Sequence, residues 1–113
     1  MGQYFRLLNY DKKEFIDPWN LGGVAKLWEW CANNQCRILP FLLRKSNEGG
    51  GGDIEKEYQT AGQWAGDRVA LVGDYDESRD FHRAETEFKN ISQEVRKDFN
   101  DFIHIKDYKL LKQ

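Results

Sequence analysis

The chain has 113 residues, of which 40% are hydrophobic and 14% aromatic, and its formal net charge is −2. This length fits one domain, and the aromatic content argues against intrinsic disorder. The near-neutral charge argues against a nucleic-acid-binding protein, and no apolar stretch approaches the roughly 20 residues that cross a bilayer.

The N-terminal residues and the cysteines indicate a compartment. The first residues lack the charged and apolar regions of a secretory signal. Cys31 and Cys36 are too few for a disulfide scaffold. We therefore expect a cytoplasmic protein whose thiols are reduced.

The first elements read as a pair of strands. Residues 3–10 predict a strand with Phe5 and Leu7 on one face and apolar side chains on the other, so both faces should be covered. Residues 14–16 predict a short return strand that Asp17-Pro18 ends, because proline has no N–H for a ladder.

Two helices are expected next. After Gly22-Gly23, an apolar stripe at helical spacing predicts a helix to about residue 33 whose core face is Val24, Leu27, Trp28 and Cys31. The apolar run 38–43 fits a helix or a strand by periodicity, and Pro40 favours a helix that starts near it.

The second half contains a loop, a strand and a helix. The four glycines 49–52 predict a mobile loop over about 46–63, and the aliphatic run 68–72 predicts a buried central strand. Residues 78–89 remain ambiguous. Ser92 is expected to cap a helix over 91–103, and the tail 105–113 could add an edge strand or fray.

Together these elements predict a single α+β domain, a small sheet covered by two or three helices. Charge is uneven along it. Residues 47–80 carry nine acidic and three basic side chains, which gives −6 in a chain whose total is −2. The acidic zone includes the residues that follow the second long strand.

The spacing of that zone resembles a calcium-binding loop. Oxygen-bearing side chains at alternate positions, ending in a glutamate, are the ligands that calcium prefers. Arg79 stands where such loops need glycine, and a strand precedes the loop where a helix belongs. Solvated carboxylates are the alternative, and no motif requires a cofactor. The candidate cation ligands are Asp74, Asp76, Ser78, Asp80 and Glu85, with His82 between them.

Several segments resemble a family of small uncharacterised bacterial and fungal proteins. The most specific is the block Trp64-Ala65-Gly66-Asp67-Arg68-Val69-Ala70-Leu71-Val72-Gly73-Asp74-Tyr75, and the residues 1–5, 9–16 and 26–29 resemble it too. The resemblance implies that residues 64–68 and 73–75 form a shared feature and that the glycine loop is a variable insertion point. It transfers no activity and no catalytic residues.

Two hypotheses follow for function. The first is a small soluble protein-interaction module without enzymatic activity, an inhibitor or immunity-type partner of another protein, binding neither nucleic acid nor membrane. Such a module would offer its acidic loop surface and its exposed aromatic side chains to the partner. The four tryptophans either fill the core or form part of that binding surface. The alternative is a small-ligand or metal-dependent site at the strand end. The candidate surface consists of Trp64, Asp67, Arg68, Asp74, Tyr75, Asp76 and His82.

Overall fold

The fold is organised around one four-stranded sheet. The structure, a computed structural model, describes residues 2–110. The strands are β1 (Phe5–Asn9), β2 (Glu14–Ile16), β3 (Val69–Gly73) and β4 (Lys89–Asn90), in the order β3-β1-β2-β4. β1 is antiparallel to both of its neighbours, whereas β2 and β4 are parallel. The predicted α+β class and the strands over 3–10 and 14–16 are confirmed. The run 68–72 also forms a strand, but its predicted central place is wrong, because β3 lies at the edge of the sheet and pairs with β1 alone among the described strands.

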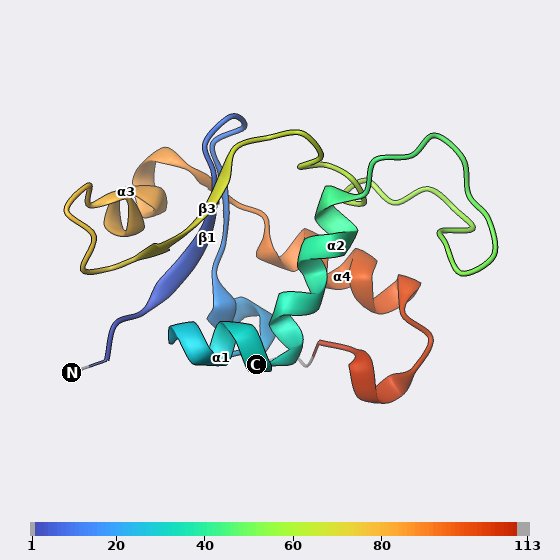
Figure 1. Cartoon of the computed structure of the whole chain (residues 1–113), viewed down its shortest axis with the longest axis horizontal. Helices are drawn as coiled ribbons and strands as arrows, with labels where there is room; N and C mark the ends of the chain where they lie inside the picture. The colour runs from blue at the N-terminus through green and yellow to red at the C-terminus, as the bar shows by residue number, and fades with distance from the viewer. Residues whose placement is uncertain (1, 111–113) are drawn as a thin grey trace.

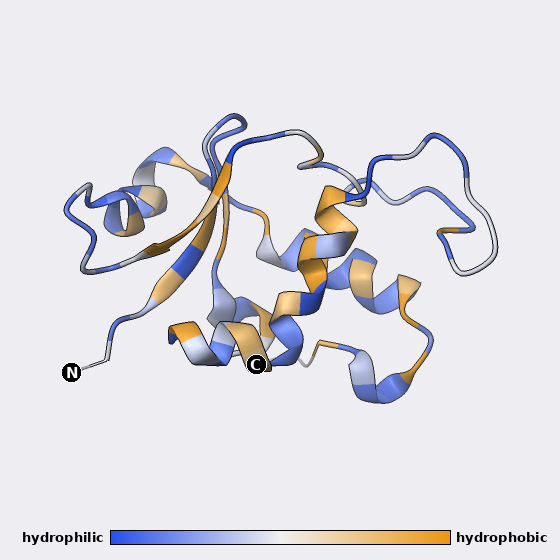
Figure 2. Cartoon of the chain, viewed as in Figure 1, coloured by the Kyte–Doolittle hydropathy of each residue, from blue (hydrophilic) through white to orange (hydrophobic). Residues whose placement is uncertain are grey.

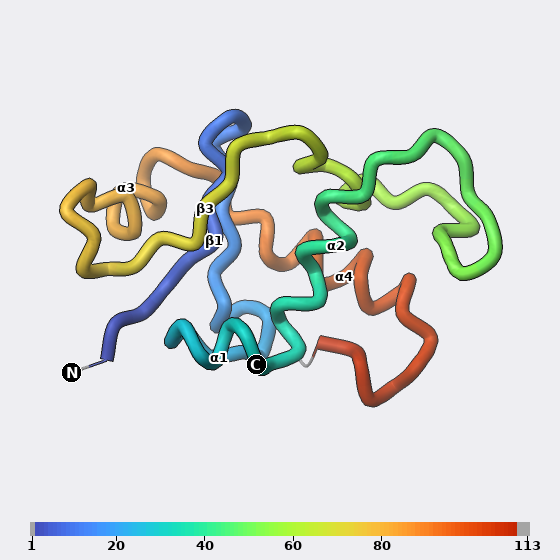
Figure 3. Tube along the Cα trace, in the orientation of Figure 1, coloured from blue at the N-terminus to red at the C-terminus, as the bar shows by residue number. Residues whose placement is uncertain are grey.

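Helices cover both faces of this sheet. The helix α3 (Asp80–Glu87) lies on one face, and the helices α1 (Leu27–Ala32), α2 (Ile38–Leu43) and α4 (Ser92–Phe102) lie on the other (Figure 1). Short 3₁₀ turns occupy Pro18–Leu21, Asn34–Arg37 and Lys106–Tyr108. The Cα trace shows the same arrangement (Figure 3). No described helix between residues 2 and 110 is long and apolar enough to cross a membrane.

The sheet separates two apolar cores, because successive side chains of a strand point to opposite faces. Leu7 packs in the larger core with Trp64 and the residues of α2 and α4, while Leu8 packs in the smaller one with Phe81 of α3. The expected covering of β1 on both faces is therefore confirmed. In Figure 2 the hydrophobic residues concentrate on β3 and on α2.

The predicted core face of the first helix is wrong. Trp28 is 66% exposed, Leu27 53%, and Val24 and Cys31 are also exposed, whereas Trp30 is buried. The helix starts only at Leu27, because Val24 is held outside it by hydrogen bonds with the side chain of Gln35. The indole of Trp30 donates to the Phe5 carbonyl at 3.1 Å, which turns the opposite face of α1 towards the sheet.

The other helices follow the sequence more closely. The run 38–43 is the helix α2, as Pro40 favoured, and α4 buries Val95 and Phe99. The predicted capping role of Ser92 is wrong. Ser92 is buried, and its hydroxyl accepts a hydrogen bond from the Asp17 amide at 2.7 Å; the Asn90 side chain accepts from the Ser92 amide instead.

No regular element lies between Leu43 and Val69. An ion pair within this long segment and a hydrogen bond to α4 hold it. Arg44 pairs with Asp53, and the Thr60 hydroxyl donates to Asp98 of α4 at 2.7 Å. In the predicted tail, Lys106–Tyr108 forms a single turn and Leu110 is buried; the final three residues lie outside the described part.

Candidate functional site

Asp67 and Arg68 stabilise the turns before β3. Asp67 accepts hydrogen bonds from Lys12 and, at 2.9 Å, from the side chain of Asn9. Arg68 does not pair with its neighbour Asp67; it donates to Asp11, from its backbone N–H at 2.8 Å and from Nε at 2.9 Å. Both carboxylates are thus committed to joining the β1–β2 turn to the start of β3.

At the other end of β3, Asp74 joins this strand to the residue that precedes β1. Its carboxylate accepts from the Tyr4 amide at 3.0 Å, and its own amide donates to the Tyr4 carbonyl at 2.8 Å. Tyr75 is exposed, and its hydroxyl lies 3.4 Å from the Gly2 carbonyl oxygen. Asp76 accepts from the Ser78 amide at 3.1 Å, and His82 is exposed on α3.

The candidate residues before β3 and those after it do not form one site. Asp67 precedes β3 and Asp74 follows it, and a strand extends by about 3.3 Å per residue, so they are roughly 20 Å apart. The hypothesis of a small-ligand or metal-dependent site requires Asp67 and Asp74 to line the same site. The five residues of β3 hold these two carboxylates apart.

The spacing that resembles a calcium loop is interrupted by α3. Asp80 begins this helix and accepts from the Tyr10 hydroxyl at 2.7 Å, whereas Glu85 pairs with Arg6 at 2.8 Å. Burial and the bond to Asp80 raise the pKa of Tyr10 to about 12. Within residues 2–110, no three histidine, cysteine or acidic side chains are gathered as metal ligands.

Trp64 belongs to the core and not to a surface that a partner could reach. It is fully buried, and its indole N–H donates to Glu14 Oε1 at 2.8 Å. Gln63 donates to the same carboxylate. The prediction that Trp64 belongs to the candidate surface is therefore wrong. Sequence spacing does not distinguish a tryptophan beside a loop that points inward from one that points outward.

A buried arginine is the polar feature that sequence reasoning missed. Arg6 is only 6% exposed, and its guanidinium lies 4.3 Å from the centre of the Phe81 ring. Nη1 donates to the Phe81 carbonyl at 2.7 Å and Nη2 to Glu85 at 2.8 Å, while Nε has no partner in the described part of the chain. The signal was present in the alternation that placed Arg6 on the same face as Leu8.

Segments with exposed aromatic and aliphatic side chains lie around the start of β1. The Tyr4 and Trp19 rings meet edge to face with centres 5.8 Å apart. The Phe5 amide donates to the Ala25 carbonyl at 2.8 Å, which brings the start of α1 beside the same end of the sheet (Figure 1). We call this surface the aromatic end; its members are Tyr4, Trp19, Leu27, Trp28 and Tyr75.

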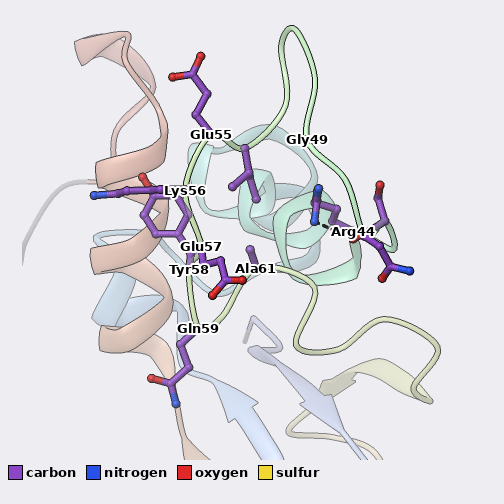
Figure 4. Close-up of a pocket in the computed structure, with 11 residues that line it drawn as sticks. Arg44, Gly49, Glu55, Lys56, Glu57, Tyr58, Gln59 and Ala61 are labelled. Carbon is purple, nitrogen blue, oxygen red and sulfur yellow. Dashed lines mark hydrogen bonds between the residues drawn. The ribbon is translucent and has the colours of Figure 1, made fainter.

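Two hollows of the described surface lie away from the aromatic end. One of them, of about 690 Å³, is polar and lies beside the glycine loop, where Arg44, Gly49, Tyr58 and Ala61 are among the residues that line it (Figure 4). A smaller apolar one, of about 310 Å³, lies between α2 and α4. Arg44 borders both, but its guanidinium is committed to Asp53 and to the carbonyls of Ser46 and Glu48. In the polar hollow the Ser46 hydroxyl donates to the Glu48 carbonyl at 2.9 Å, and not to a basic side chain.

Comparisons with known proteins match this chain to no family model, no curated protein and no solved structure.

We expect acid to destabilise the fold, because carboxylates with lowered pKa values hold the turns. The bond from Lys12 lowers the pKa of Asp67, and the bonds from Arg68 lower that of Asp11. A lowered pKa in the folded state contributes stability at neutral pH that is lost as the pH falls below about 4. We expect the midpoint urea concentration to be lower at about pH 3 than at about pH 6.

The variant Lys12→Gln provides the control for this prediction. Because it removes the charge that acts on Asp67, the midpoint should depend less on pH in the variant than in the unmodified chain. A midpoint that is equal or higher in acid would contradict the assignment.

Proposed function

We propose that this chain is a small cytoplasmic interaction module that binds another protein through its aromatic end, in the manner of an inhibitor or immunity-type partner. The observation that carries the proposal is Trp28, which keeps 66% of its surface exposed on a helix whose other tryptophan, Trp30, fills the core. Exposed tryptophan and tyrosine are enriched among the residues that dominate protein interfaces.

The composition of the aromatic end also supports binding. Leu27 precedes Trp28 and is 53% exposed, and the edge-to-face pair of Tyr4 and Trp19 comes from two other segments. Rigid aromatic rings lose little conformational entropy on binding, and their burial removes a large apolar area from water. By contrast, the described carboxylates near β3 are used within the fold.

Affinity capture from lysate of the source cells tests this surface. The immobilised chain and its Trp28→Ala variant are compared by quantitative mass spectrometry. We expect at least one protein to be retained by the unmodified chain and reduced about tenfold or more on the variant, which corresponds to at least 1.4 kcal/mol. If that protein is an enzyme, adding the chain to its purified form should lower its activity.

The matched control is Tyr108→Ala, since Tyr108 is an exposed aromatic residue outside the aromatic end. Its captured proteins should equal those of the unmodified chain. A capture profile that Trp28→Ala leaves unchanged, or that both variants reduce equally, would refute the proposal.

A further inference from the structure

The outer edge of β3 is a second surface, distinct from the aromatic end. β3 is the terminal strand of the sheet, and among the described strands only β1 pairs with it. In Figures 1 and 3, β3 lies in front of β1 and no other ribbon passes across it. The second edge of β3 is therefore not paired with any described strand.

The hydrogen bonds at the two ends of the β1–β3 pair show which backbone groups point outward. The Tyr10 amide donates to the Arg68 carbonyl at 2.9 Å, and the Asp74 amide donates to the Tyr4 carbonyl at 2.8 Å. Bonds of an antiparallel pair recur at every second residue, so Ala70 and Val72 also face β1. The N–H and C=O groups of Val69 and Leu71 then point to the open edge.

This edge has none of the usual protections against pairing. Natural edge strands carry lysine, proline or inward-pointing charges that prevent the addition of another strand. The five residues of β3 are Val-Ala-Leu-Val-Gly, without a charge or a proline. Charged residues flank the strand on both sides: Arg68 comes directly before it and Asp74 directly after it.

We propose that a second copy of this chain pairs antiparallel with β3 about a two-fold axis at Leu71. In that register the numbers of two facing residues add up to 142, so Val69 lies opposite Gly73 and Ala70 opposite Val72 of the second copy. Leu71 faces Leu71 of the second copy, so both outward groups exchange hydrogen bonds there. The Gly73 carbonyl already accepts from the Asp76 amide at 3.1 Å, which limits the shared ladder to the strand itself.

Charge complementarity favours this occupant and this register. Arg68 falls opposite Asp74 of the second copy, and symmetry repeats the pair at the other end. The Arg68 side chain is 80% exposed; its Nε and Nη2 bond Asp11 at 2.9 Å, so Nη1 is the donor that would reach the second copy. On Asp74, Oδ1 accepts from the Tyr4 amide, so the other carboxylate oxygen would be the acceptor. Opposite charges directly across an antiparallel pair are favourable. A register shifted by two residues would place Asp74 against Ala70, and a parallel pairing would oppose Arg68 to Arg68.

Sedimentation equilibrium of the purified full chain tests this pairing without any other protein. The apparent mass should rise with concentration from 13.3 kDa towards twice that value. Arg68→Asp and Asp74→Arg should each weaken dimerisation about tenfold or more, because each opposes like charges twice in the dimer. The double variant Arg68→Asp/Asp74→Arg should restore it to within about threefold.

Controls separate pairing from folding. Arg37→Asp makes the same charge change on an exposed residue next to α2 and should dimerise normally. Circular dichroism establishes that each variant is folded. A monomer at every concentration, or a dimer that both single reversals leave unchanged, would overturn the proposal, as would failure of the folded double variant to recover. Because Trp28 takes no part, this result is independent of that for the aromatic end.

Discussion

Replacing Trp64 with alanine is expected to lower the free energy of unfolding by about 3–5 kcal/mol. The side chain is fully buried in the larger core, so its removal leaves a cavity that the surrounding residues fill only in part. Glu14 also loses the indole donor that lies 2.8 Å away. A loss of this size is a large part of the ~5–15 kcal/mol that stabilises an ordinary domain. Urea denaturation followed by circular dichroism measures it.

Trp28→Ala is the matched control, because it makes the same chemical truncation at a side chain that is 66% exposed. Its free energy of unfolding should stay within about 0.5 kcal/mol of that of the unmodified chain. Equal losses for the two variants would contradict the assignment of Trp64 to the core. A normal stability also validates Trp28→Ala as a probe of binding.

Replacing Arg6 with alanine is expected to cost about 2–4 kcal/mol, because it removes packing and a buried hydrogen bond together. The guanidinium stacks on Phe81, and Nη1 donates to the carbonyl of the same residue at 2.7 Å. Without that donor the carbonyl is left without its side-chain partner. Urea denaturation at neutral pH measures the change.

Two further variants separate packing from charge. Arg6→Met keeps most of the apolar stem and removes the buried Nε that has no partner in the described structure, so it should cost less than half as much as Arg6→Ala. Glu85→Ala removes only the exposed carboxylate and should be the mildest of the three. If Glu85→Ala cost as much as Arg6→Ala, the ion pair and not the packing would be the source of stability.

The strands β1, β2 and β3 could be predicted from the sequence because their signals are local, whereas the two-residue strand β4 was not predicted. The alternation in residues 3–10 and the aliphatic run 68–72 each require a strand, and β2 follows from its turn and from Pro18. The order of the strands could not be predicted. It depends on which distant side chains meet, such as Asp67 with Lys12 and Asp74 with Tyr4.

The first helix shows why periodicity alone is insufficient. Val24, Leu27, Trp28 and Cys31 satisfy a helical stripe, yet the hydrogen bonds of Gln35 and Trp30 decide where the helix begins and which face it buries. The same long-range contacts decide the candidate site: they bury Trp64 and commit the carboxylates near β3. The apolar stripe was therefore predicted to be the core face of α1, whereas it is the exposed face.

The pairing of β1 with β3 has a consequence for synthesis of the chain. Leu7 pairs with Leu71, which is made 64 residues later, so a nascent chain carries an apolar strand whose partner does not yet exist. Only the short β2 can pair with β1 in the interval, and a two-stranded hairpin is marginal in water. Contacts this distant in sequence slow folding. Fragments that end before residue 69 should therefore expose β1 and aggregate, whereas the longer chain folds around it.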